Sequence, residues 1–163
     1  MEDLKLKENI QLLIKKSIDD PLVKILAKNS HLTRVQLETL LINILSENIL
    51  GKKIKYEEKA NLRLTKSKIS RGSFNRTLKQ AEENVIKSIY TILLLGYLGI
   101  FENASLEPYI EAANKIREYV EAHKNILSND NNDQLKEQLK LLKMLREELE
   151  DSLNYLSKPL HEK

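Results

Sequence analysis

The chain contains no cysteine among its 163 residues. This absence excludes a disulfide framework, a thiolate metal site and a cysteine nucleophile. The first residues, Met1 to Lys7, also lack the basic-then-apolar order of a secretory signal peptide. Together these absences predict a cytoplasmic protein.

Glycine and proline, which interrupt helices, are scarce, and so are phenylalanine and tryptophan. There are four Gly, three Pro, two Phe and no Trp, whereas 41% of the residues are hydrophobic and 31% are charged. This balance favours helices over turn-rich sheets. We therefore expect an all-α fold, with one ordinary core or a small domain that carries an extension.

The common motifs of catalysis are missing. The sequence has no Gly-rich phosphate loop, no His-x-x-x-His pair and no Gly-x-Ser-x-Gly elbow. Its histidines, His31, His123 and His161, are far apart in the sequence, and such residues are more often surface groups than ligands or bases. Neighbouring carboxylates such as Glu57 and Glu58 diverge by about 100° on a helix and cannot act as one acid–base couple. We expect neither an enzymatic activity nor a cofactor or metal.

The net charge of +3 conceals a local excess of positive charge between Lys52 and Lys79. This segment carries ten basic side chains against Glu57 and Glu58, a balance of +8, which leaves −5 for the rest of the chain. Clustered cations can neutralise the phosphates of nucleic acid, although a charge run is commonly just a solvated face. The ten basic residues are Lys52, Lys53, Lys55, Lys59, Arg63, Lys66, Lys68, Arg71, Arg76 and Lys79.

The stretch 69–80 has the pattern of a helix that packs on one side and meets a ligand on the other. Ser70 is a good N-cap. Phe74, Leu78 and Ala81 recur at helical spacing and predict an inward face. Short or forked polar side chains, which reach phosphates and base edges, occupy the other positions. The candidate DNA-binding residues are Lys66, Lys68, Ser70, Arg71, Ser73, Asn75, Arg76 and Lys79.

Residues 32–83 resemble helix-turn-helix proteins of the sigma-factor region-four type. Their Leu-Thr-x-x-Gln/Glu opening helix is matched by Leu32–Leu41, and their Ile-Ser-Arg-Gly-Thr/Ser recognition segment by Ile69–Ser73. The helix Tyr56–Ala60 would act as the scaffold. The resemblance implies a domain that binds double-stranded DNA. The chain departs from the pattern at 61–69, where such motifs have a turn of three or four residues.

Apolar periodicity and capping signals predict helices around this segment. The first covers 2–18. The second begins with the Asp20 N-cap and Pro21 and stops near residue 29. The third, central in the core, runs from a Thr33–Gln36 capping box to about residue 50, with Gly51 as its C-cap. Residues 52–68 form either a small wing of strands or, in the interpretation that we prefer, a short helix over 56–64.

Between Val85 and Phe101 nearly every residue is apolar. Lys87 interrupts this run and two glycines fall near its end, whereas a membrane span needs about 20 predominantly apolar residues. We therefore expect that the recognition helix continues into this run, is buried there on all sides, and ends near Gly96.

The last third of the chain predicts a helical arm, residues 104–163, after a DNA-binding domain of residues 1–103. One helix starts at Glu107, a polar turn occupies 128–133, and the final helix carries leucines at seven-residue intervals. Arg146 interrupts this seam. The seam either joins two chains into a homodimer or folds back on 107–127, and both hold if two hairpins form a four-helix bundle. The candidate dimerisation residues are Leu135, Leu139, Leu142, Leu149, Leu153 and Leu156.

These patterns favour a homodimeric protein that binds double-stranded DNA, as a transcriptional regulator or a chromatin-associated factor. The alternative is a structural or interaction protein that uses its coiled-coil arm to bind a protein partner, with a basic segment that is only solvated. Neither hypothesis involves a membrane or a small-molecule ligand.

Overall fold

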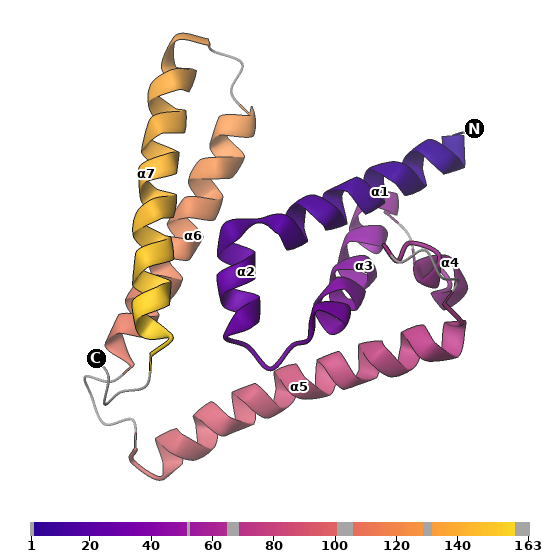
Figure 1. The fold of residues 1–163 in the computed structure, drawn as a ribbon, viewed down its shortest axis with the longest axis horizontal. Coiled ribbons are helices and arrows are strands. Elements are labelled where there is room, and N and C mark those ends of the chain that lie inside the picture. Colours follow the sequence, from indigo (N-terminus) through magenta and orange to yellow (C-terminus); the bar gives the residue numbers. More distant parts are fainter. Residues whose placement is uncertain (1, 52, 65–68, 101–105, 129–131, 159–163) are drawn as a thin grey trace. The chain divides into compact units, whose positions relative to one another are not determined.

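The computed structural model describes residues 2–51, 53–64, 69–100, 106–128 and 132–158. These residues form seven helices and no strand, so the all-α expectation is confirmed (Figure 1). The chain divides into two compact units, Met1–Leu93 and Leu94–Lys163. The sequence-based boundary was placed after residue 103.

The second and third helices begin where their capping residues predicted, and the third also ends at its predicted cap. Asp20 Oδ1 accepts a hydrogen bond from the Val23 amide at 3.1 Å. Thr33 and Gln36 form a reciprocal capping box, and Gly51 ends its helix in the left-handed region at φ 61°. The helices that begin in this unit are α1 (Glu2–Asp19), α2 (Pro21–Lys28), α3 (Arg34–Leu50), α4 (Tyr56–Ala60) and α5 (Arg71–Tyr97), and the last turn of α5 belongs to the second unit.

The segment between α3 and α5 is a short helix, as we preferred, and not a wing within the described residues. α4 ends at Ala60, however, and not near residue 64. The connection to α5 therefore spans 61–70, of which 65–68 lie outside the described residues. This connection is longer than the three or four residues of an ordinary helix-turn-helix turn.

The core of the first unit is built on α1. Ile10, Ile14 and Ile18 follow one another at four-residue intervals and are buried. They pack with residues of α3, α4 and α5, among which Phe74 is completely buried. α5 is thus attached to the core through its first half. The remaining buried members of the cluster are Ile42, Ala60, Leu62 and Leu78.

The expectation that the apolar run after Val85 is buried on all sides is wrong. Side chains from Val85 to Tyr97 are between 42% and 90% exposed wherever they are large and apolar, except for the half-buried Leu95. The expected end of the helix near Gly96 is confirmed, since α5 ends at Tyr97, and the positive φ of 67° falls at Gly99. An apolar pattern shows that a segment can be buried, but not that a neighbouring element reaches it. No helix in the described part of the chain has the length and hydropathy of a membrane span.

The second unit contains α6 (Glu107–Ser128) and α7 (Asn132–Leu156), which lie side by side and antiparallel (Figure 1). Lys115 Nζ lies 2.6 Å from Glu148 Oε1, and the Tyr109 hydroxyl donates to the Leu156 carbonyl at 3.1 Å. The helical hairpin, one of the two alternatives left open by the sequence, is therefore formed within the chain.

The leucine seam of α7 contributes to this hairpin. Leu142, Leu149 and Leu156 are buried, whereas Leu139 is 48% exposed and Leu153 is half-buried. The side chain of Leu135 lies outside the described residues. Arg146, the polar interruption of the seam, lies with its Nε 3.4 Å from Glu150 Oε1 on the same helix. Three of the six candidate dimerisation residues thus already have partners within the chain.

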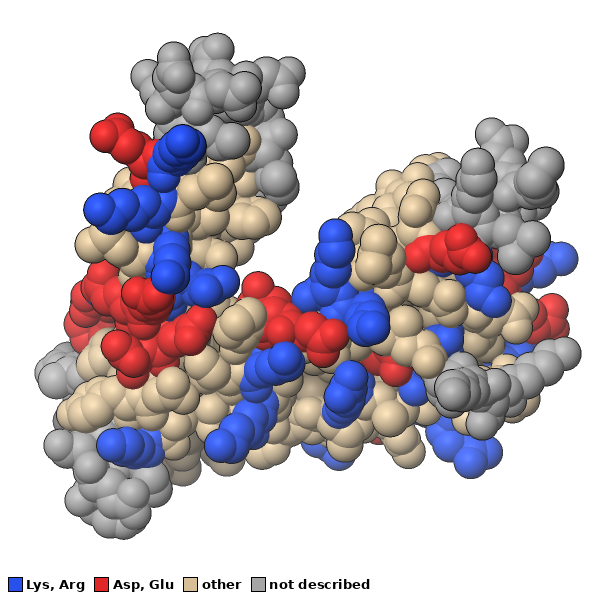
Figure 2. Space-filling model, turned by 45° about the horizontal axis from the view of Figure 1, so that its top comes forward, with Lys and Arg blue, Asp and Glu red and all other residues tan. Residues whose placement is uncertain are grey.

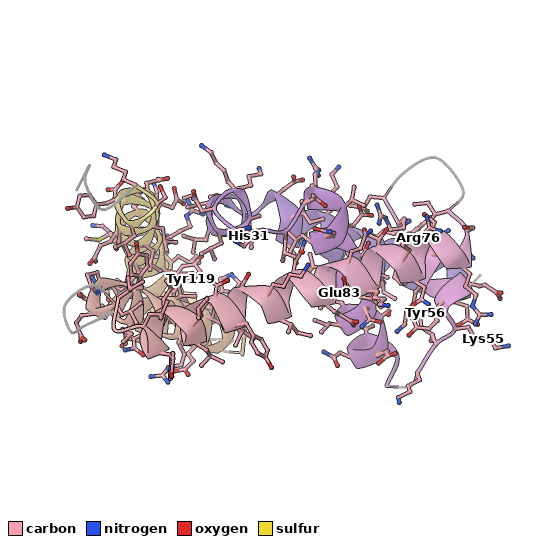
Figure 3. The ribbon with its side chains drawn as sticks, turned by 90° about the horizontal axis from the view of Figure 1, so that it is seen from below. His31, Lys55, Tyr56, Arg76, Glu83 and Tyr119 are labelled. Carbon is pink, nitrogen blue, oxygen red and sulfur yellow. The ribbon has the colours of Figure 1, made fainter. Side chains whose placement is uncertain are left out.

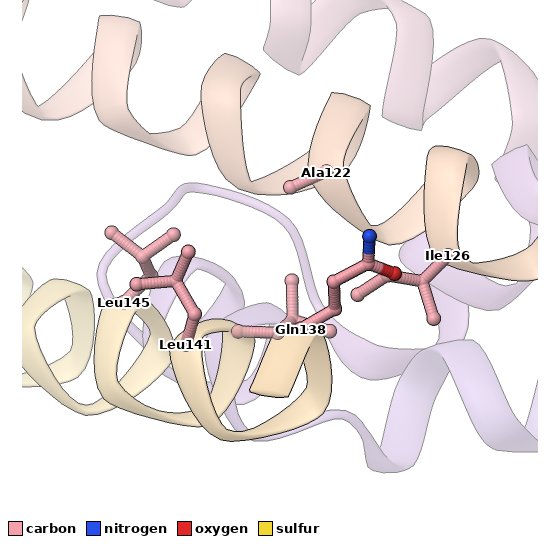
Figure 4. A pocket seen from close by; sticks show the side chains of 6 residues that line it. Ala122, Ile126, Gln138, Leu141 and Leu145 are labelled. Atoms are coloured by element: carbon pink, nitrogen blue, oxygen red, sulfur yellow. The ribbon is translucent and has the colours of Figure 1, made fainter. Parts of the chain in front are cut away.

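The hairpin leaves a hollow between its helices (Figure 4). Its lining is apolar apart from one amide and contains no charged side chain. The lining therefore supplies no side chain that could act as a general acid or base or bind a metal ion. The lining residues are Ala122, Ile126, Gln138, Leu141, Leu142 and Leu145.

We predict that Phe74→Ala lowers the free energy of unfolding of the first unit by about 3–5 kcal/mol, because it leaves a cavity at a fully buried position. Urea unfolding followed by circular dichroism measures this change. Gln80→Ala, at an exposed position on the same helix, should stay within about 0.5 kcal/mol of the wild type. Equal effects of the two substitutions would contradict the assignment of Phe74 to the core.

Candidate nucleic-acid interface

The first half of α5 separates polar from apolar side chains as the sequence predicted. Phe74, Leu78 and Ala81 are buried. The candidate side chains on the rest of the helix surface are exposed, and Figure 3 shows Arg76 on this part of α5. The structure therefore brings together five of the eight predicted DNA-binding residues as exposed side chains of one helix: Arg71, Ser73, Asn75, Arg76 and Lys79.

The other predicted residues fall into two groups. Ser70 is the N-cap of α5, and its Oγ accepts a hydrogen bond from the Ser73 amide at 3.2 Å. Its hydroxyl therefore has a structural role at the start of the helix. Lys66 and Lys68 lie outside the described residues.

The helix surface at the start of α5 is open. A Cβ placed on Gly72 would have no atom within 4 Å apart from those of its chain neighbours and of the adjacent helix backbone. Lys79 Nζ lies 3.9 Å from Glu83 Oε1, but the two side chains are 77% and 49% exposed. Such an exposed pair is weak, so it leaves the ammonium group of Lys79 available to an anionic ligand.

The start of α4 lies next to the start of α5. The rings of Tyr56 and Phe74 are 6.4 Å apart between centroids. A surface hollow is lined by Lys55, Tyr56 and Arg71, together with Ile54 and Glu57. Lys55, labelled with Tyr56 in Figure 3, is thus a neighbour of the α5 surface that no motif singled out. Only its membership of the basic run indicated it.

Of the seven basic residues of the run that the structure describes, two are buried. Lys59 is 3% exposed, and its Nζ lies 2.6 Å from both Asn43 Oδ1 and Glu47 Oε1. The same ammonium group lies 5.4 Å from the centroid of the Tyr56 ring, within the range of a cation–π contact. The charge of Lys59 is therefore used internally and does not reach a ligand.

Arg63 is the second internal cation. Its Nε lies 3.0 Å from Glu38 Oε1, an ion pair without the alignment of a hydrogen bond, and its Nη1 donates to Thr39 Oγ1 at 2.7 Å. Glu38 Oε1 also accepts a hydrogen bond from the Leu64 amide at 2.6 Å. Both charged side chains are less than 10% exposed. This cluster ties the start of the α4–α5 connection to α3.

The exposed positive charge is consequently smaller than the sequence indicated. Five described cations of the run are exposed, against the two exposed anions Glu57 and Glu58, a balance of +3. Lys52, like Lys66 and Lys68, lies outside the described residues. The five exposed cations are Lys53, Lys55, Arg71, Arg76 and Lys79.

The charges of the hairpin are arranged differently. Figure 2 shows acidic side chains gathered over one end of the hairpin and basic ones toward the other. Along α7, Lys136, Lys140 and Lys143 precede a cluster formed by Glu147, Glu148, Glu150 and Asp151. The acidic end does not suit a polyanion.

No protein-family model, curated protein or solved structure matches this chain.

The hydrogen bond from Lys59 lowers the pKa of Glu47 below its ordinary value of 4.5. A carboxylate with a lowered pKa contributes stability that is present above the pKa of the unfolded chain and is lost as the pH falls through the lower, folded-state pKa. We predict that Glu47→Gln lowers the stability of the protein at pH 7. Below about pH 4.5 the variant should lose less stability than the wild type does. Urea midpoints at neutral and acidic pH test this.

Glu82→Gln, at an exposed position on α5, is the control and should follow the wild type at each pH. If Glu47→Gln shows the full acid loss of the wild type, the ion pair does not contribute to the pH dependence.

Proposed function

We propose that the protein binds double-stranded DNA through the exposed side chains of the first half of α5, and that it acts as a homodimeric transcriptional regulator or chromatin-associated factor in the cytoplasm. The main support for this proposal is that polar and apolar side chains lie on different sides of the first half of α5. Its polar and basic side chains are exposed, while Phe74, Leu78 and Ala81 attach it to the core.

The spacing of the exposed residues fits a helix in the major groove. Arg71, Asn75 and Lys79 follow one another at four-residue intervals and line one stripe of the helix. Gly72 and Arg76 form the adjacent stripe, where the missing side chain of Gly72 allows close approach of a phosphate backbone. Asn pairs with adenine and Arg with guanine through two hydrogen bonds each. Lys79 and Arg71, at the two ends, would contact phosphates.

We assign α3, α4 and α5 as the successive helices of a helix-turn-helix domain with a long connection, and their order along the chain supports this assignment. In such domains the helix before the recognition helix contacts the DNA backbone. Lys55, which lines the same hollow as Arg71, supplies this contact. In place of a tight turn, the Glu38–Arg63 pair holds the beginning of the connection on α3.

The proposed dimer would compensate for the small area that one copy of the α5 surface can bury on DNA. One module of this kind buries roughly 600–1,000 Å² on DNA, which is low for tight and selective binding. Two-fold proteins solve this problem by reading two half-sites.

The alternative, an interaction protein that binds a partner with its hairpin, rests on one observation. Leu139, Leu141 and Met144 of α7 are 48–59% exposed. If DNA binding is not found, this apolar surface is the next candidate for function.

We predict that binding to nonspecific duplex DNA weakens steeply with salt. Replacing Lys55, Arg71 and Lys79 with Ala should reduce the slope of log affinity against log salt by about 0.9 for each lost phosphate contact. Fluorescence anisotropy at several salt concentrations measures the slope.

A second triple variant is the control for total charge. Replacing Lys136, Lys140 and Lys143 of α7 with Ala removes the same charge from exposed positions in the hairpin. This variant should keep the wild-type slope. Equal loss in both variants would show that binding depends on net charge and not on the α5 surface.

We also predict that Asn75 and Arg76 read base edges. Replacing either residue with Ala should cost about 1–3 kcal/mol at one base pair and relax the preference there. Selection from a randomised duplex library measures the preference, with Asn154→Ala, at an exposed position in the hairpin, as the control. If both variants weaken all sequences equally, Asn75 and Arg76 only position the protein.

A further inference from the structure

The second half of α5 presents an apolar surface of large, exposed side chains. A helix that is apolar on all sides is normally buried. Here the exposed fractions of the side chains range from 42% for Val85 to 90% for Tyr97. We call this surface the α5 apolar face, and its residues are Val85, Ile86, Ile89, Tyr90, Ile92, Leu93, Leu94 and Tyr97.

The area of this face matches one side of a stable interface. Its two tyrosines, 68% and 90% exposed, alone present roughly 240–400 Å² when a tyrosine has about 150–250 Å². Its six aliphatic side chains, 42–61% exposed, add to this area. The largest apolar patch on a typical monomer is roughly 300–600 Å². A standard interface buries about 800 Å² on each partner.

The pattern of the face favours an identical helix as its partner. Ile86, Tyr90, Leu93 and Tyr97 are spaced by four, three and four residues, which is the spacing of a helix–helix seam. No charged residue occurs from Ser88 to Ile100. A charged partner could therefore form no ion pair with this stretch, whereas a second apolar seam could pack against it.

The order of large and smaller residues in the seam also suits antiparallel pairing. When two such seams run in opposite directions, Tyr90 lies opposite Leu93 and Ile86 lies opposite Tyr97 of the other copy. Each tyrosine then meets an aliphatic side chain. In a parallel pair the tyrosines would meet each other at two levels.

We infer that a second copy of this chain covers the α5 apolar face, through antiparallel pairing of the second halves of two α5 helices about a two-fold axis. This inference deepens the proposed homodimer by naming its interface, and it does not depend on DNA binding. The interface is isologous, since the same surface is used by both copies.

Sedimentation velocity of the full chain tests the interface. The wild type should be a dimer, and Leu93→Lys should raise the dimer dissociation constant by at least about 100-fold, because two ammonium groups would be buried without partners. Leu141→Lys places the same charge at an exposed leucine of the hairpin and should leave the dimer intact. Circular dichroism checks that both variants keep the helicity of the wild type.

Cysteine cross-linking tests the antiparallel orientation, since the natural chain has no cysteine. A mixture of Ile86→Cys and Tyr97→Cys chains should form a disulfide between the two variants under mild oxidation. Each variant alone should not, because like positions would be roughly 16 Å apart along the paired helices, beyond the reach of a disulfide. Self-linking of each variant would indicate a parallel pair and overturn the proposed arrangement.

Three other results would also overturn the inference. A monomeric wild type would mean that the hairpin of the same chain, or a different partner, covers the face. A dimer that survives Leu93→Lys, or one that dissociates with Leu141→Lys alone, would place the interface elsewhere. In each case salt-dependent DNA binding, measured separately, can still hold, so the proposal for DNA binding stands or falls by itself.

Discussion

The buried ion pair between Glu38 and Arg63 is the interaction on which the candidate interface depends. Two desolvated charges are stable only when good geometry and further hydrogen bonds compensate for lost hydration, and loss of one partner typically costs about 3–5 kcal/mol. Here Thr39 Oγ1 and the Leu64 amide complete the cluster. Because Glu38 belongs to α3 and Arg63 follows α4, the pair fixes the chain at the beginning of the connection that leads to α5.

The same cluster, together with buried Lys59, reduces the positive charge that the basic segment exposes. Arg63 and Lys59 contribute to the net charge of the run, yet both are buried against carboxylates or polar oxygens of α3. The cations that remain exposed are fewer and lie around the starts of α4 and α5. The electrostatic field that a polyanion would meet is therefore localised at the α5 surface, where the amide of Asn75 can add sequence preference to charge attraction.

α5 carries two surfaces of different chemistry on one continuous helix. Its first half is anchored by Phe74 and exposes polar side chains, whereas its second half exposes apolar ones. Asn84 lies between them and donates hydrogen bonds to the His31 carbonyl at 3.1 Å and to Gln36 Oε1 at 3.3 Å. If two copies pair through the second half and the first half binds DNA, as we propose, the continuous helix would relate the position of one DNA-binding surface to that of the other. The dimer interface would then set the spacing of the two half-sites.

The sequence by itself determined the helices and most of their ends, because capping hydrogen bonds join residues only a few positions apart. Asp20, the Thr33–Gln36 box, Ser70 and the inward face begun by Phe74 all follow from such local rules. Tertiary structure decided which charges are internal, because Lys59 meets Glu47 12 positions away and the Leu64 amide meets Glu38 26 positions away. It also decided that the α7 leucines are buried within their own hairpin and that the second half of α5 is exposed. Periodicity reports which side of a helix can be buried, but only the placement of neighbouring elements determines whether anything buries it.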